Sequence, residues 1–136
     1  MTEGAIRGPV TDDQGSAVVT GVLAVSVVIM LTLAVVQGLL VMHVRSIAAS
    51  AAQDGALAAS RRGASTGQGI AATNATLQFA AAGPLQTWNT TANRLGDRVQ
   101  VTVRGQVVSV LGFGNVDVTV TRGMRLEEFR PQGVTP

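Results

Sequence analysis

The chain has 136 residues, of which 46% are hydrophobic and only 13% are charged. Because soluble domains usually carry about 25% charged residues, the composition predicts one compact unit with a membrane segment or an extensive buried surface. The absence of cysteine excludes disulfides and thiolate metal sites, and the net charge of +2, without a concentrated basic stripe, predicts no nucleic-acid partner.

The first predicted element is an apolar helix. No charged residue occurs between Asp13 and His43, and the run Ser16–Val36 has about the ~20 residues that cross a bilayer core. Hydroxyls within it can return their hydrogen bonds to the helix backbone. A buried helix of so small a chain would rarely stay apolar this long. A cleaved secretory signal would have a shorter apolar core and a basic start, whereas residues 1–15 are acid-rich. We therefore predict a polar leader over residues 1–15 and a single transmembrane helix over residues 16–42, with membrane lipid as a partner.

Small residues recur four positions apart in this helix, at Ala17 and Gly21 and again at Ala34 and Gly38. Such spacing lets a second helix approach closely in lipid, where packing drives association. The alternative is that Gly and Ala are simply frequent there.

Charge alone leaves the orientation open. Arg7 precedes the span, whereas Arg45, Arg61 and Arg62 follow it. The positive-inside rule would therefore place the C-terminus in the cytoplasm, but long segments translocate with little regard to charge.

Residues 43–62 are rich in Ala, the strongest helix former, and predict that the helix continues outside the bilayer. Gly55 is its one interior weak point, and Arg61 to Gly63 resemble a last turn with its cap. Because a surface of Ala and Ser buries well only against another close-packed helix, we interpret it as an assembly surface.

Residues 63–130 predict a small α+β domain, and residues 131–136 a tail. Ser65 and Gln68 have the spacing of a capping box, which begins a short helix over about 67–82. The residues on its apolar face are Ile70, Thr73, Leu77 and Ala81.

Two strands follow from period-two alternation. Their apolar positions are Val99, Val101 and Val103, and Val116, Val118 and Val120, with Gly112, Gly114 and Asn115 between them. Leu85–Thr91 is a possible third strand, in which Trp88 is a core residue or, alternatively, a partner contact. The last strand is expected to reach about Phe129.

So thin a core is marginal by itself, and we expect it to pack on the distal half of the long helix. The predicted fold class is α+β, with a long N-terminal helix, a short second helix and an antiparallel sheet of two to three strands.

The sequence predicts no enzyme, no cofactor, no metal site and no small-molecule substrate. Its one histidine, His43, lies at the expected membrane boundary. Glu127 and Glu128 are adjacent, so on a strand they would point to opposite faces. Gly112 to Gly114 lack the Lys and helix of a phosphate loop.

Three features in order along the chain resemble the TadE-like family, the minor pilins or pseudopilins of tight-adherence pilus systems. They are the entry Asp13–Ala17, the Ala-rich stretch Ala48–Arg61 and the ending Met124–Pro131. The resemblance implies a pilin-like fold and cleavage between Gly15 and Ser16 by a prepilin-type peptidase. It also implies a domain outside the cytoplasm and, as partners, other pilin-like subunits and the pilus assembly machinery.

One position departs from that pattern. Pilins of this class usually carry Glu five residues after the cut, where this chain has Thr20. Thr20 avoids the cost of a carboxylate in lipid, but it cannot pair with a neighbouring subunit's terminal amine. The alternative function is therefore a membrane-anchored accessory or interaction module of a secretion apparatus that is neither processed nor polymerised.

Overall fold

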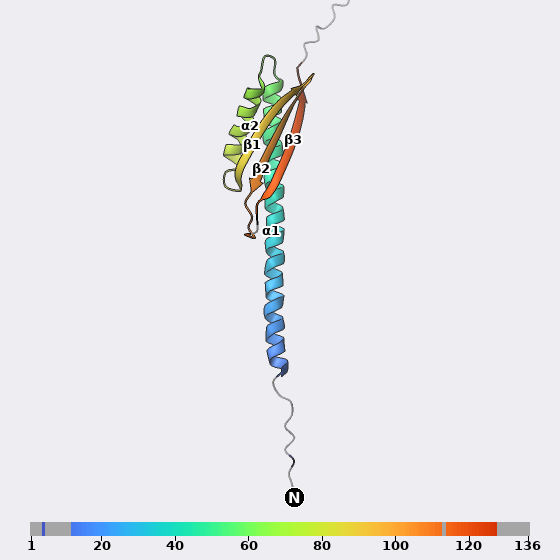
Figure 1. Cartoon of the computed structure of the whole chain (residues 1–136), viewed down its shortest axis with the longest axis vertical. Coiled ribbons are helices and arrows are strands. Elements are labelled where there is room, and N and C mark those ends of the chain that lie inside the picture. The colour runs from blue at the N-terminus through green and yellow to red at the C-terminus, as the bar shows by residue number, and fades with distance from the viewer. Residues whose placement is uncertain (1–3, 5–11, 113, 128–136) are drawn as a thin grey trace, which may run out of the picture. The chain divides into compact units, whose positions relative to one another are not determined.

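The computed structural model describes residue 4, residues 12–112 and residues 114–127. The described elements, in chain order, are α1 (Asp12–Ser60), α2 (Thr66–Ala80), β1 (Leu85–Leu95), β2 (Arg98–Val107) and β3 (Val116–Arg125). The predicted α+β class is confirmed (Figure 1). The chain divides into two compact units, Met1–Val35 and Val36–Pro136, and the division falls within α1.

The first unit, as far as it is described, is the N-terminal part of α1. Most of its apolar side chains are exposed, and its 18-residue apolar window is 0% buried. The hydroxyls of Ser26 and Thr32 donate to the carbonyl oxygens of Val22 and Val28, at 2.9 and 2.8 Å. These bonds satisfy the hydroxyls within the helix, as the sequence predicts. α1 is thus long and apolar enough to cross a membrane.

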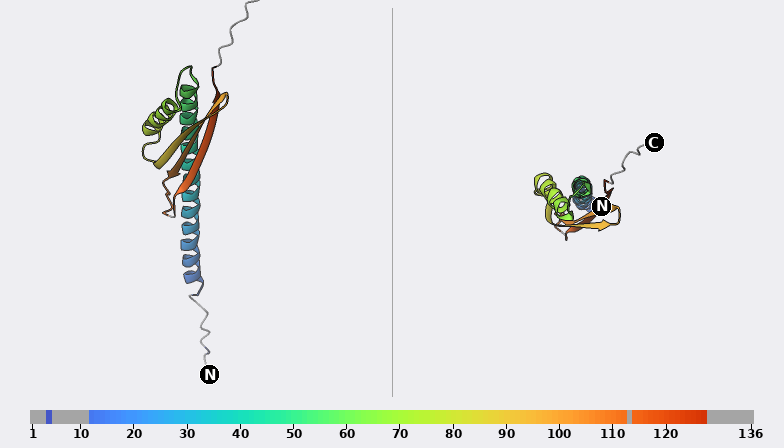
Figure 2. Two further views of the ribbon diagram at one scale, coloured as in Figure 1. Left: turned by 45° about the horizontal axis from the view of Figure 1, so that its top comes forward. Right: turned by 90° about the horizontal axis from the view of Figure 1, so that it is seen from above.

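The second unit has two layers. Its sheet is antiparallel in the order β1-β2-β3. Figure 2 shows α2 and the Val36–Ser60 part of α1 on the same face of this sheet. The core between the layers is built mainly of Ala and Val, and its fully buried members include Val44, Ala51, Ala52, Ala59, Leu77, Val99, Val101 and Val107. The prediction that the sheet packs on the distal part of α1 is confirmed.

The strands follow the predicted alternation. Val99, Val101 and Val103 of β2 are buried, while the residues between them are exposed or half-buried. The hairpin from β1 to β2 turns through Gly96 and Asp97, and the φ of +60° at Gly96 is one that glycine adopts without strain. One face of the sheet is therefore apolar and covered, and the other is polar.

The ends of two strands differ from the prediction. β1 continues to Leu95, beyond the expected end at Thr91, because pairing with β2 holds residues that lack an apolar alternation. A register shift between Leu85 and Thr87 also breaks the period of two. β3 ends at Arg125, so its expected extension is wrong for residues 126 and 127.

Several predictions fall outside the described residues. Phe129, the tail 131–136, most of the leader 1–15 and the pair partner Glu128 are among them.

The helical hairpin of the second unit is closely packed at two glycines. A Cβ added to Gly55 would overlap the Thr73 side chain and lie 2.6 Å from the carbonyl oxygen of Gly69. A Cβ added to Gly69 would lie 2.8 Å from the Cβ of Ala59. Gly55 is therefore the place where α2 approaches α1, and not only a weak point of the helix.

The Ala-rich surface of residues 43–62 also has a different role from the one predicted. Ala51, Ala52 and Ala59 are fully buried within the second unit, against the core that α2 and the sheet complete. The interpretation of this Ala face as an assembly surface is wrong, because the chain supplies its own close-packed helix. The exposed positions of this part of α1 are mainly polar, such as Ser46, Ser50 and Gln53.

α2 begins as predicted. The Ser65 hydroxyl accepts from the backbone N–H of Gln68 at 3.3 Å, and the Gln68 side chain accepts from the Ser65 N–H at 3.2 Å. This capping box starts the helix at Thr66, and Ala80 is its last residue. The expected bounds of 67 and 82 differ by one and two residues, within the fraying of helix ends. Thr73, Leu77 and Ala81 of the predicted apolar face are buried, and Ile70 is half-buried.

Candidate functional site: the apolar part of α1 and the surface of the second unit

The residues singled out for processing and helix packing lie on the exposed surface of α1. Gly15, Ser16, Ala17, Thr20 and Gly21 all belong to its first turns and are exposed. A Cβ added at Gly15 or Gly21 would meet nothing within 4 Å. No described residue of the chain covers them, so this surface is open to lipid or to another helix.

The second pair of small residues straddles the division between the units. Ala34 belongs to the first unit and Gly38 to the second, and both are exposed. A Cβ added at Gly38 would meet nothing within 4 Å. The absence of a side chain at Gly38 is therefore not required by any described contact within the chain.

Gln37 is a functional candidate that sequence reasoning missed. It lies in the predicted span but is only 8% exposed. Its Oε1 accepts from the backbone N–H of Val110 at 2.6 Å, and its Nε2 donates to the carbonyl oxygen of Val108 at 3.3 Å. The side chain thus holds the connection between β2 and β3 against α1. One signal could have found it, since Gln37 is the only amide side chain between Ser16 and Met42.

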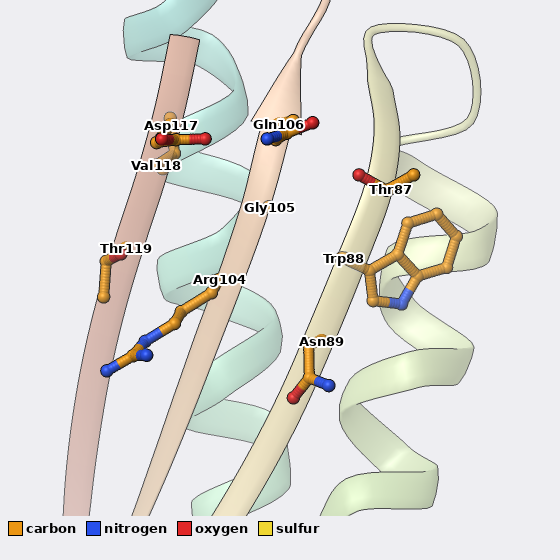
Figure 3. Close-up of a pocket in the computed structure, with 9 residues that line it drawn as sticks. All are labelled: Thr87, Trp88, Asn89, Arg104, Gly105, Gln106, Asp117, Val118 and Thr119. Carbon is orange, nitrogen blue, oxygen red and sulfur yellow. The ribbon is translucent and has the colours of Figure 1, made fainter. Parts of the chain in front are cut away.

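The outer face of the sheet carries a shallow hollow of about 500 Å³. Figure 3 shows Arg104 in the middle of it, directed toward Thr119 of β3, with Asn89 on the neighbouring β1. Asp117 and Gln106 lie side by side toward one end. The hollow is open and carries hydroxyls, amides and two charged groups, Arg104 and Asp117, whereas the sites that enclose small ligands are concave.

Trp88 is one of the residues that line this hollow, but its side chain is directed toward α2 (Figure 3) and belongs to the edge of the core. Its indole Nε1 donates to the Asn74 side chain of α2 at 3.3 Å, and the Thr90 hydroxyl donates to the same oxygen at 2.8 Å. The ring is half-buried and packs on the hydrophobic core. Of the two interpretations offered from the sequence, the core role is the one with observed contacts.

The titratable groups are dispersed. Among the described residues there is no group of three or more His, Asp or Glu side chains that could hold a metal ion. His43 is exposed. Arg125 and Asp97 form an ion pair at 3.9 Å, with side chains 74% and 69% exposed, and such surface pairs contribute little.

Comparison of the chain with protein-family models, with curated proteins and with solved structures gives no match. The resemblance to the TadE-like family therefore stays a prediction from the sequence.

Proposed function

We propose that this chain is a non-enzymatic, single-pass membrane subunit that assembles with other membrane helices, as a TadE-like minor pilin or pseudopilin of a tight-adherence pilus. Its partners would be similar subunits and the pilus assembly machinery, with no cofactor. In this proposal the second unit lies outside the cytoplasm.

The observation that carries the proposal is the exposure of the apolar part of α1. Val18, Met30 and Leu31 are 67%, 67% and 62% exposed. Ser16–Val36 as a helix is about 32 Å long, close to the ~30 Å of a bilayer's hydrocarbon core. Leaving so many large apolar side chains in water would be costly, so lipid or neighbouring helices are their natural surroundings.

A second support is the contrast between large and small exposed residues in this segment. Ala17, Gly21 and Ala34 leave local depressions among Val and Leu, and close helix approach in lipid requires such depressions. The second unit completes its core with its own helices and sheet. Assembly would therefore depend on the exposed apolar segment and on polar surfaces of the second unit.

The test is the intact mass and N-terminal sequence of the full chain recovered from its native membrane. A mature chain that begins at Ser16 is the expected result, and it would also place the second unit outside the cytoplasm. A chain that keeps residues 1–15 would overturn processing.

That second result would favour the other candidate, a permanently anchored interaction module of a secretion apparatus. Thr20 is the observation in its favour, because this position lacks the carboxylate on which subunit pairing in a filament would depend. Crosslinking in the native membrane separates the two candidates further. A pilin-like subunit would crosslink through Ala17 or Gly21 to other pilin-like helices, whereas an anchored module would crosslink through its second unit.

A further inference from the structure

The connection between β2 and β3 is unusual for an exposed loop because three large apolar residues lie close together in it. Val108, Val110 and Leu111 occur within five residues, and Val110 is 44% exposed. Its backbone is bonded at both ends of this stretch. The Val108 N–H donates to the carbonyl oxygen of Pro84 at 3.0 Å, and the Gly112 N–H donates to that of Ser109 at 3.5 Å.

Gln37 holds this loop at one particular level of α1. The contact joins the Gln37 amide to Val108 and Val110, all within the second unit. Gln37 is the second residue of that unit and directly follows Val36, the last residue of the apolar run. If that run spans the bilayer, chain connectivity places Gln37 where the hydrocarbon core ends, and the two hydrogen bonds place the loop beside Gln37.

The exposed side of α1 remains apolar beyond this level. Leu39 and Met42 are 62% and 70% exposed, whereas His43 and Arg45 begin the polar part of the helix. Met42 lies about 7.5 Å further along the axis than Gln37, at a rise of about 1.5 Å per residue. The change from apolar to polar surface therefore occurs above the level of the loop, so the loop lies within the apolar zone.

The hydrogen bonds fit that location. Irregular backbone at membrane depth is tolerated only where its polar groups find partners, because lipid offers none. Gln37 supplies an acceptor for the Val110 N–H and a donor for the Val108 carbonyl, and the loop satisfies both ends of the Gln37 amide in return. The Gln37 amide, the Val108 carbonyl and the Val110 N–H thus satisfy one another.

We propose that residues 108–112 form a membrane-interface anchor, in which Val110 and Leu111 insert into the lipid layer beside α1 while Gln37 holds the loop backbone. The occupant of this apolar surface is lipid, at the boundary between acyl chains and headgroups. The inference rests on the proposed membrane span but not on pilin identity or on processing. The second unit is then held to the bilayer at two places, which restricts its rotation and tilt at the membrane surface.

The absence of native cysteine allows a direct test in the full chain. Val110→Cys carries a single nitroxide spin label in phosphatidylcholine vesicles, and its accessibility to oxygen, which partitions into lipid, is compared with that to a water-soluble nickel chelate. Leu95→Cys is the matched control. Leu95 is apolar and 60% exposed, and it lies at the start of the hairpin turn that contains Asp97. The Asp97 carbonyl oxygen accepts from the Leu126 N–H, and the Ser60 carbonyl oxygen accepts from the N–H of the next residue, Glu127. Ser60 lies about 35 Å from Gln37 along α1.

We expect the label at position 110 to favour oxygen and the label at position 95 to favour the nickel chelate, by several-fold in each case. Equal access of the chelate to both positions would overturn the proposal. Low access of both reagents at position 110 would also overturn it, since a protein surface and not lipid would then cover the loop.

A third label separates this inference from the proposed function. Leu31→Cys lies in the middle of the apolar run, so a label there must favour oxygen if the helix spans the bilayer. Chelate access at position 31 would refute the span itself, whereas oxygen preference at position 31 with chelate access at position 110 would refute only the loop anchor.

Adding Gln37→Leu should increase label mobility at position 110 and leave label mobility at position 95 unchanged. Unchanged mobility at both positions would show that Gln37 does not hold the loop.

Discussion

The two parts of α1 use opposite kinds of side chain for opposite surroundings. In the first unit the helix exposes Val, Leu, Ile and Met, and none of its apolar window is buried. In the second unit the same helix buries Ala51, Ala52 and Ala59 completely. The part of α1 that packs within the chain therefore carries small side chains at these positions, whereas the exposed part carries large ones.

The physical reason is the presence of a partner within the chain. α2 approaches so closely that Gly55 and Gly69 have no room for a Cβ. The first unit has no such described partner, so its large side chains stay available for lipid or other helices. Four predictions test this contrast, from the largest expected effect to the smallest.

The largest effect should come from truncating a leucine whose surroundings lie within the chain. Leu77 is fully buried, whereas Leu23 is 61% exposed. We expect Leu77→Ala to lower the free energy of unfolding of the second unit by about 2–5 kcal/mol, because it leaves a cavity. Thermal unfolding of the full chain in detergent, followed by circular dichroism, measures this, and Leu23→Ala should leave that transition unchanged. Similar effects of both variants would contradict the contrast.

An introduced charge should have its larger effect in the first unit, the reverse of the leucine truncation. We expect Leu31→Arg to disfavour membrane insertion by about 2.5–3.5 kcal/mol, while Leu57→Arg, at a position 42% exposed in the second unit, should insert normally. The fraction of chain that resists alkaline extraction from vesicles measures insertion. Full retention of the Leu31 variant would argue against a spanning helix.

The two glycines of α1 in the second unit should respond differently to alanine. For Gly55→Ala we expect a net loss of about 1–2 kcal/mol, because overpacking against α2 exceeds the roughly 1 kcal/mol by which Ala is favoured over Gly in a helix. Gly38→Ala meets nothing within 4 Å, so its unfolding midpoint should rise slightly. Chemical unfolding of the full chain in micelles distinguishes them, and a gain for Gly55→Ala would mean that the helices are not closely packed there.

The smallest effect concerns the start of α2. Ser65→Ala removes the acceptor of the capping box and should cost about 1 kcal/mol. Amide hydrogen exchange in the first turn of α2 should become faster, while exchange in β2 changes only by the global loss. Ser50→Ala is the matched control, since Ser50 is exposed in mid-helix. Equal exchange in both variants would show that the cap does not stabilise α2.

Local patterns predicted much of the fold. The apolar run, the capping box at Ser65 and the alternation of Val99, Val101 and Val103 each depend on neighbours within a few positions, and each is confirmed. β1 was less predictable, because its polar residues are held by pairing with β2 and its register shifts near Leu85. The candidate site residues on α1 could be placed on the helix, but their use in assembly stays a prediction.

The sequence by itself determined the two helices, the alternating strands β2 and β3, and which part of α1 is suited to a membrane, because hydrophobic period and run length are local properties. Only the tertiary structure decided that the Ala face is internal, that Gly55 is a contact with α2 and that Gln37 holds the loop at Val110. These depend on residues 14 to 73 positions apart in the chain. Ala, Gly and Gln occur in internal packing, in helix association and on exposed surfaces. Only the position of a distant partner therefore distinguishes these roles.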